Sequence, residues 1–146
     1  MKSLNVRTND FPAIAVDPTD ARHLVSDWQD SRHSAPGAGT YSVLVSDSTN
    51  GGATWSDASG GGTVLDGAAG EALSQPSVAV TGTGTTAVSF YRANPFTGTA
   101  VGLGDYSSIA ASSAPGSNVV HAVWADTRNS SSAGPDEDVF MATVTP

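Results

Sequence analysis

The chain contains no cysteine and few basic residues, with Lys and Arg together filling only six of 146 positions. The lack of cysteine excludes disulfide bonds, thiolate metal sites and cysteine nucleophiles, so the fold must be stabilised by packing alone. The shortage of cations argues against long amphipathic helices with regular i,i+4 ion pairs. With 16 Gly, 8 Pro and many Ser and Thr residues, the composition favours strands and turns.

Acidic residues outnumber the basic ones, and the formal net charge is −8. Such a chain repels a phosphate backbone, so we expect no nucleic-acid partner. No apolar run is long enough to cross a bilayer, and residues 1–9 lack the apolar stretch of a signal peptide. We expect no membrane span. The acidic, Ser/Thr/Gly-rich composition favours a secreted or extracellular location.

Short β-branched runs recur along the chain, each bounded by Gly, Pro, Asp or Asn. This pattern predicts strands joined in an antiparallel meander, and therefore an all-β fold. The predicted strands cover residues 12–16, 23–28, 41–46, 76–80, 86–91, 107–111, 119–124 and 139–144.

The predicted strands repeat as three units of a single domain, at about residues 10–70, 71–101 and 102–146. The first and third units share the pattern Trp-x-Asp-x-Arg in their second strand. Its tryptophans, Trp28 and Trp124, are 96 residues apart (124 − 28), which is twice 48 and close to the repeat of a propeller blade. The middle unit is abbreviated, because no third strand is predicted before Gly102. We therefore expect about three antiparallel blades.

A hairpin motif follows the third predicted strand of the first unit. Asn50 and Gly51 tolerate left-handed backbone angles, the hydroxyls of Ser48 and Thr54 can bond backbone groups, and Trp55 can pack beneath the turn. The motif positions are Ser48, Asn50, Gly52, Thr54 and Trp55. The motif is thus predicted to stabilise the fold and to take no part in chemistry.

Residues 48–55 resemble the Asp-box, or BNR, repeat Ser-x-Asp-x-Gly-x-Thr-Trp of the sialidase (neuraminidase) superfamily, with Asn50 in the aspartate place. Gly104-Asp105-Tyr106 before an Ile-Ala-Ala strand, together with the repeated Trp-x-Asp-x-Arg, is similar to the last blades of such proteins. The resemblance covers nearly the whole chain. It implies a β-propeller, six-bladed in the family, that is related to glycoside hydrolases and directed at carbohydrate. In the family, Asp boxes lie on the rim away from the substrate.

Candidate site residues gather on the face opposite the Asp box if consecutive strands of each unit are antiparallel. The candidate substrate-binding residues are Arg32, Arg92, Arg128, Asp105 and Asp126. The three arginines hold matching places in the three units, and converging guanidinium groups would suit a carboxylate such as that of sialic acid. The alternative is that each Asp-x-Arg pair forms a local ion pair that fixes the end of its strand.

Sialidases use a tyrosine nucleophile, so the resemblance offers Tyr106 as nucleophile and Asp10 or Asp30 as the catalytic acid. The alternative for Tyr106 is a buried ring whose hydroxyl bonds near a strand end. The family's Phe-Arg-Ile-Pro motif is replaced here by Asp10-Phe11-Pro12, which has no arginine. Two function classes follow: an exo-sialidase-like glycoside hydrolase, or a non-catalytic binding or scaffolding propeller.

No cofactor and no metal site is predicted. The acids at residues 136–138 could offer oxygen ligands to calcium, but a run of acids on a loop is usually solvated. An array of three blades leaves sheet edges and an apolar flank open. We therefore expect self-association into a closed ring, or the remainder of a longer chain that completes it.

Overall fold

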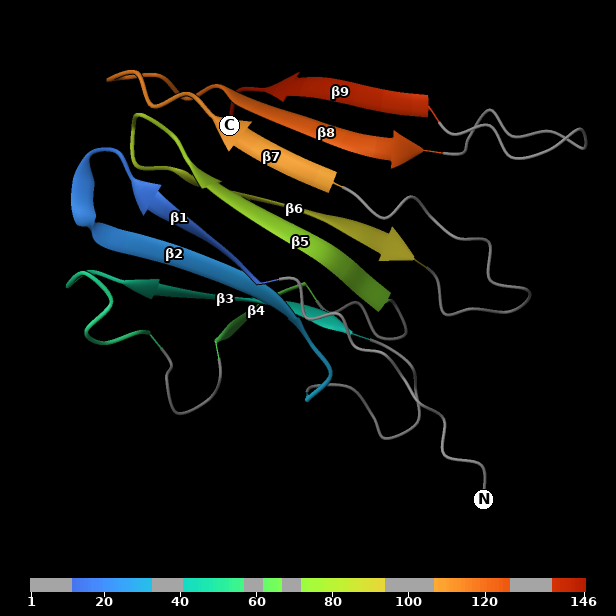
Figure 1. Ribbon diagram of the computed structural model, residues 1–146, viewed down its shortest axis with the longest axis horizontal. Helices are drawn as coiled ribbons and strands as arrows, with labels where there is room; N and C mark the ends of the chain where they lie inside the picture. Colours follow the sequence, from blue (N-terminus) through green and yellow to red (C-terminus); the bar gives the residue numbers. More distant parts are fainter. Residues whose placement is uncertain (1–11, 33–40, 57–61, 67–71, 94–106, 127–137) are drawn as a thin grey trace, which may run out of the picture.

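The computed structural model describes residues 12–32, 41–56, 62–66, 72–93, 107–126 and 138–146. These residues form three small antiparallel sheets, called A, B and C here, and no helix (Figure 1). The prediction of an all-β fold is confirmed. No helix in the described ranges is long and apolar enough to cross a lipid bilayer.

Sheet A has the strand order β1-β2-β3-β4, sheet B pairs β5 with β6, and sheet C has the order β7-β8-β9. The strands are β1 (Ala13–Asp17), β2 (Asp20–Asp30), β3 (Ser42–Ser48), β4 (Thr63–Asp66), β5 (Ala72–Val80), β6 (Thr86–Ala93), β7 (Ser107–Ala111), β8 (Val120–Asp126) and β9 (Asp138–Val144). Each predicted strand is present, with ends that differ by at most a few residues. Strand β4 was not predicted, because a run of four residues is too short to stand out from its Gly-rich surroundings.

The sheets are stacked with B between A and C (Figure 1). Strand β5 contacts β1 on one side and β7 on the other, so the first strands of the three sheets lie next to one another in chain order. The core between sheets A and B is built by the buried residues Val25, Val78 and Val80. Smaller side chains such as Ala13 and Ala15 pack against this cluster. The close approach of small and β-branched residues is what allows two sheets to bury their facing surfaces.

The turns between the first and second strands of sheets B and C are joined by hydrogen bonds. The amide of Gly82 donates to the carbonyl of Ser112 at 2.7 Å, and the amide of Gly116 donates to the carbonyl of Gly82 at 3.2 Å. The hydroxyls of Thr81 and Thr83 both donate to Oδ1 of Asn118, at 3.0 and 2.9 Å. Sheets B and C are therefore held at their turns by directional bonds as well as by packing.

The described strands form an open row, and no sheet closes on itself. Sheet A spans residues 13–66, sheet B 72–93 and sheet C 107–144. Within the described residues, sheet B has only two strands, whereas sheet A has four.

Candidate functional site

The carboxyl ends of strands β2, β6 and β8 lie on one side of the stack, because these strands run in the same direction (Figure 1). Asp30 ends β2, Arg92 lies one residue before the end of β6, and Asp126 ends β8. The backbone therefore brings these three predicted positions to the same side. The side chains of Arg92 and Asp126 are not among those described, and four further predictions lie outside the described residues. These are Asp10, Asp105, Tyr106 and Arg128.

Asp30 is held by three donors from its own strand end. Its Oδ1 accepts a hydrogen bond from the backbone amide of Arg32 at 2.7 Å, and its Oδ2 lies 2.6 Å from a guanidinium nitrogen of Arg32. The indole nitrogen of Trp28 donates to Oδ2 at 3.1 Å. This arrangement is the local Asp-x-Arg ion pair that the sequence offered as the alternative to a carboxylate clamp.

These donors also set the ionisation of Asp30. Partial burial opposes the charged form, but the amide and guanidinium of Arg32 and the indole of Trp28 together hold the pKa of Asp30 below its usual value. The carboxyl is ionised at neutral pH, so it does not supply a proton in this geometry. Arg32 is half exposed and its guanidinium is already paired with the carboxylate of Asp30. Fewer of its N–H groups are therefore left to bind an anionic ligand.

The hairpin motif between β3 and β4 lies at the opposite end of sheet A, since Ser48 pairs with Leu24 whereas Asp30 pairs with Ser42. Ser48 is buried, and its hydroxyl accepts a hydrogen bond from the amide of Gly52 at 2.9 Å. The ring of Trp55 lies beside Gly52, where an added Cβ would sit 3.9 Å from a ring carbon. The motif thus bonds its own backbone.

Asn50 is at the centre of this motif, but it does not adopt the left-handed backbone conformation that the sequence suggested for it. Its Oδ1 accepts from the amide of Thr54 at 2.9 Å and from the hydroxyl of Ser48 at 3.0 Å, and its Nδ2 donates to Thr54 Oγ1 at 2.7 Å. The left-handed angles belong to Gly51 (φ 72°) and Gly52 (φ 88°), and not to Asn50. The two glycines adopt the left-handed conformations that the turn requires, so Asn50 contributes to the turn through its side chain.

Replacing Asn50 with alanine is expected to lower the free energy of unfolding by about 1–2 kcal/mol, because the amide of Thr54 and the hydroxyl of Ser48 lose their shared acceptor. Asn50→Asp is the matched variant. It keeps both acceptor bonds and takes a third from the Thr54 hydroxyl, so it should retain the stability of the parent. Urea denaturation of the three proteins checks this, and equal losses for both variants would contradict the side-chain role.

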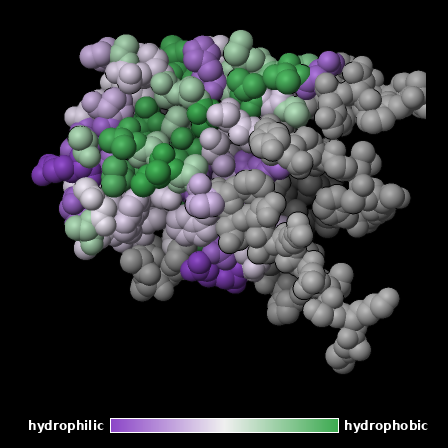
Figure 2. All heavy atoms as spheres, in the orientation of Figure 1, coloured by the Kyte–Doolittle hydropathy of each residue, from purple (hydrophilic) through white to green (hydrophobic). Residues whose placement is uncertain are grey.

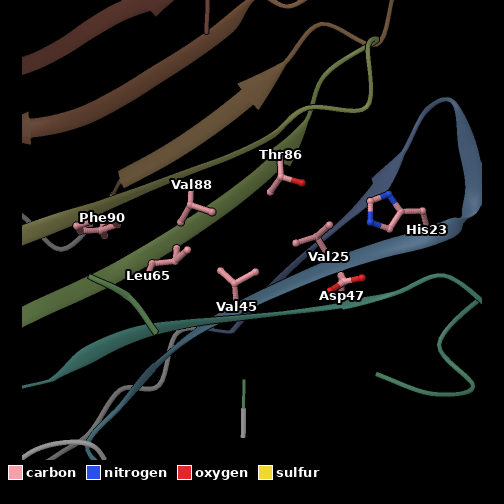
Figure 3. Close-up of a pocket in the computed structure, with 8 residues that line it drawn as sticks. All are labelled: His23, Val25, Val45, Asp47, Leu65, Thr86, Val88 and Phe90. Atoms are coloured by element: carbon pink, nitrogen blue, oxygen red, sulfur yellow. The ribbon is translucent and has the colours of Figure 1, made fainter. Parts of the chain in front are cut away.

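A cleft of about 530 Å³ lies between sheets A and B (Figure 3). Its lining residues are His23, Val25, Val45, Asp47, Leu65, Thr86, Val88 and Phe90. The cleft has an apolar middle, and the polar groups of His23, Asp47 and Thr86 gather at one end, away from Phe90 at the other (Figure 3). Its walls come from β2, β3 and β4 of sheet A and from β6 of sheet B. The cleft is therefore a feature of the packing between sheets A and B.

The polar end of the cleft is braced by the turn between β1 and β2. Nδ1 of His23 lies 2.9 Å from Oδ2 of Asp17, while Oδ1 of Asp17 accepts from the amide and the hydroxyl of Thr19, both at 2.7 Å. The bonds from His23 and Thr19 lower the pKa of Asp17 to about 2. An ionised carboxylate only accepts hydrogen bonds, so Nδ1 of His23 carries the proton. In the neutral ring, Nε2 is left as an acceptor.

Sequence reasoning missed three features of this region. It found no ligand spacing around His23, although the Asp-Pro-Thr turn that ends at Thr19 is a typical site for a side chain to bond a neighbouring amide. It did not single out Asp27, which is fully buried between sheets A and B. It also missed Gln75, which has a φ of 52° at an irregularity in β5. No local pattern marks Asp27, because its burial results from sheet stacking, whereas Gln75 directly precedes Pro76 at the irregularity in β5.

Among the described residues, no group of three or more His, Cys, Asp or Glu side chains could hold a metal ion. A comparison of the chain with family models, with curated proteins and with solved structures found no match.

Proposed function

We propose that this chain is part of a sialidase-like, Asp-box β-propeller related to glycoside hydrolases, and that it binds carbohydrate without hydrolysing it. Two observations support the architecture. The three described sheets pack with their first strands β1, β5 and β7 in chain order, as the blades of a propeller do. The Asp-box-like hairpin of residues 48–55 forms a closed hydrogen-bonded turn between the third and fourth strands of sheet A.

The cleft between sheets A and B is the observation that carries the binding proposal. Sugars present apolar C–H faces and rings of hydroxyl groups, so their sites combine an aromatic or apolar wall with a few hydrogen-bonding side chains. Phe90 supplies the ring, Thr86 a hydroxyl, Asp47 a carboxylate and His23 a ring nitrogen, all around one cleft (Figure 3). The carboxylate of Asp47, in a chain of net charge −8, favours neutral over anionic sugars at this cleft.

The state of Asp30 supports binding over hydrolysis. Its carboxylate is engaged by Arg32 and Trp28, and its lowered pKa keeps it ionised, whereas a catalytic acid must hold a proton near the working pH. The hydrolase alternative rests on Tyr106 as nucleophile with Asp10 as acid, two residues that lie outside the described ranges.

A glycan-binding panel with neutral and sialylated sugars tests the proposal, together with turnover of a fluorogenic sialoside. We expect binding to neutral glycans that weakens at least about tenfold in Phe90→Ala, because the apolar wall of the cleft is removed. Thr143→Ala, which alters an exposed residue of sheet C, is the matched control and should bind like the parent. Loss of binding in both variants, or no binding to any glycan, would overturn the proposal. Turnover that Tyr106→Phe abolishes would establish the hydrolase instead.

A further inference from the structure

Each end of the sheet stack carries apolar side chains on a face that no described strand covers. On sheet A these are Ile14 and Val16 of the edge strand β1, exposed by 61% and 55%, and Val64 of β4 at the opposite edge of the sheet. The register places the three on the face opposite to the one that packs on sheet B. We call this set the A face. Ile14 and Val16 are neighbours on this face of β1, whereas Leu44, which lies between β1 and Val64 on the same face, is buried. Isolated apolar residues on a surface are ordinary, but neighbouring ones at a sheet edge favour an interaction surface.

Sheet C carries the second set. Val139 and Met141 of β9 are exposed by 77% and 69%, and Val123 of β8 pairs directly with Met141. These three residues form what we call the C face. The other described residues of this sheet face are Ser108, Ala110, His121, Ala125 and Thr143. No Asp, Glu, Lys or Arg is among them, although the chain holds 14 acidic residues, so charge is kept away from this surface.

We infer that two copies of this chain associate with the A face of each copy packed on the C face of the other. The contacts within one chain show how such faces meet. Sheet A packs on sheet B, and sheet B on sheet C, through small and β-branched residues with β1, β5 and β7 adjacent. The A and C faces offer the same kind of side chain at the two ends of this row, so a second copy continues the packing.

The positions of the two faces explain why one partner copy suffices. Figure 2 shows hydrophobic side chains gathered around β1 and, separately, along β9, on the same side of the molecule. A copy related by a twofold axis through that side covers both areas at once, and the A-to-C contact then occurs twice. The assembly closes into a ring of twice the three described sheets and leaves neither face exposed. This inference uses only the sheet faces and does not depend on carbohydrate binding.

Sedimentation over a concentration series tests the association, with charges placed on each face in turn. We expect the parent at about 29 kDa, twice the 14.7 kDa of one chain. Ile14→Lys and Met141→Lys should each raise the dissociation constant at least about tenfold, because either change buries an unpaired charge in both contacts. Ala53→Lys, on the exposed hairpin loop, is the matched control and should remain dimeric. Circular dichroism verifies that each variant keeps its strands.

Mixing the two variants separates this arrangement from other dimers. In a mixed pair the two lysines meet in one contact, which stays open, while the other contact has both faces intact. Equimolar Ile14→Lys and Met141→Lys should therefore form a dimer of about 29 kDa, twice 14.7 kDa, at lower concentration than either variant alone. A parent that stays monomeric, or dissociation by only one of the two lysine variants, would overturn the inference, since the second result indicates like faces in contact.

A crosslinking experiment keeps the inference testable if a lysine variant does not fold. The chain has no cysteine, so introduced thiols are the only ones present. The double variant Ile14→Cys/Met141→Cys should give covalent dimers with a short, flexible bis-maleimide, whereas each single variant should not. Equally efficient crosslinking of a single variant would place like faces together and contradict the A-to-C arrangement.

Discussion

Replacing Asp27 with asparagine is expected to stabilise the protein at pH 8 and to remove most of its loss of stability between pH 5 and 8. Asp27 is 0% exposed, and neither carboxylate oxygen has a hydrogen-bond partner. Burial raises the pKa of Asp27 to about 7, and the nearby backbone groups of Ala13 and Asp27 itself offset this only in part. Asparagine has nearly the same shape and no charge to bury.

The sign of the pH dependence follows from the raised pKa of Asp27. Between its ordinary value of 3.8 and about 7, the folded protein holds a proton that the unfolded chain has released. The contribution of Asp27 to stability is therefore complete below pH 3.8 and falls as the pH rises, by up to about 1.4 kcal/mol per pH unit, until it levels off above pH 7. Over this window the loss reaches at most about 4 kcal/mol, and the asparagine variant should not show it.

Asp17 acts in the opposite direction and limits stability in acid. Its pKa is lowered to about 2 by His23 and Thr19, so its contribution is present above pH 3.8 and is lost as the pH falls toward 2. Together with the raised pKa of Asp27, this places the maximum of the joint contribution of these two carboxyls near pH 4. Asp17 therefore lowers stability on the acidic side of this maximum, and Asp27 lowers it on the alkaline side.

Urea denaturation at pH 5 and pH 8 measures both effects. The matched control is Asp20→Asn, because Asp20 is partly exposed and its pKa is lowered by the amide and side chain of Arg22. This control should keep the parent's loss of stability between pH 5 and 8. If Asp27→Asn kept that loss as well, the buried carboxyl of Asp27 would not be its source.

The strands were predictable from sequence, whereas the burial of Asp27 was not. In β2 the large apolar residues Leu24 and Trp28 lie on the same face. A simple amphipathic interpretation of the sequence places that face in the core. The opposite face, with Val25, Asp27 and Gln29, is the one that sheet stacking buries. Sheet A carries apolar side chains on both of its faces, so alternation along β2 does not report which face is inside. The local hairpin of residues 48–55 was predictable because its bonds join residues close in sequence.

The cleft and the predicted site differ in the same way. Asp30 and Arg32 are two residues apart, so their pairing is a local event that a repeated Asp-x-Arg pattern can indicate. The cleft instead joins His23 of sheet A to Phe90 of sheet B, which only the packing of two sheets brings together. No spacing along the chain encodes this arrangement, because it depends on how the two sheets pack on each other.

Replacing Gly82 with alanine is expected to destabilise the protein by about 3 kcal/mol, because the junction of sheets B and C leaves no room for a Cβ atom. The added carbon would lie 1.8 Å from the carbonyl oxygen of Ala114 and 2.7 Å from its carbonyl carbon. These are backbone atoms of the turn between β7 and β8, so no side-chain rotation relieves the clash. That turn must move away, and the bonds from Gly82 to Ser112 and from Gly116 to Gly82 must stretch or break.

Gly51→Ala is the matched control for this substitution, because it separates backbone strain from crowding. Gly51 has a φ of 72° but no atom within 4 Å of an added Cβ, so alanine there should cost only about 1 kcal/mol of left-handed strain. Hydrogen exchange of the amides of Gly82 and Gly116 provides the local readout. In Gly82→Ala both should exchange faster, while the strands of sheet A keep their protection relative to the global stability. Equal losses of stability in the two variants, with Gly116 still protected, would show that the junction of sheets B and C yields easily. The stacked turns would then not be what holds the row of sheets together.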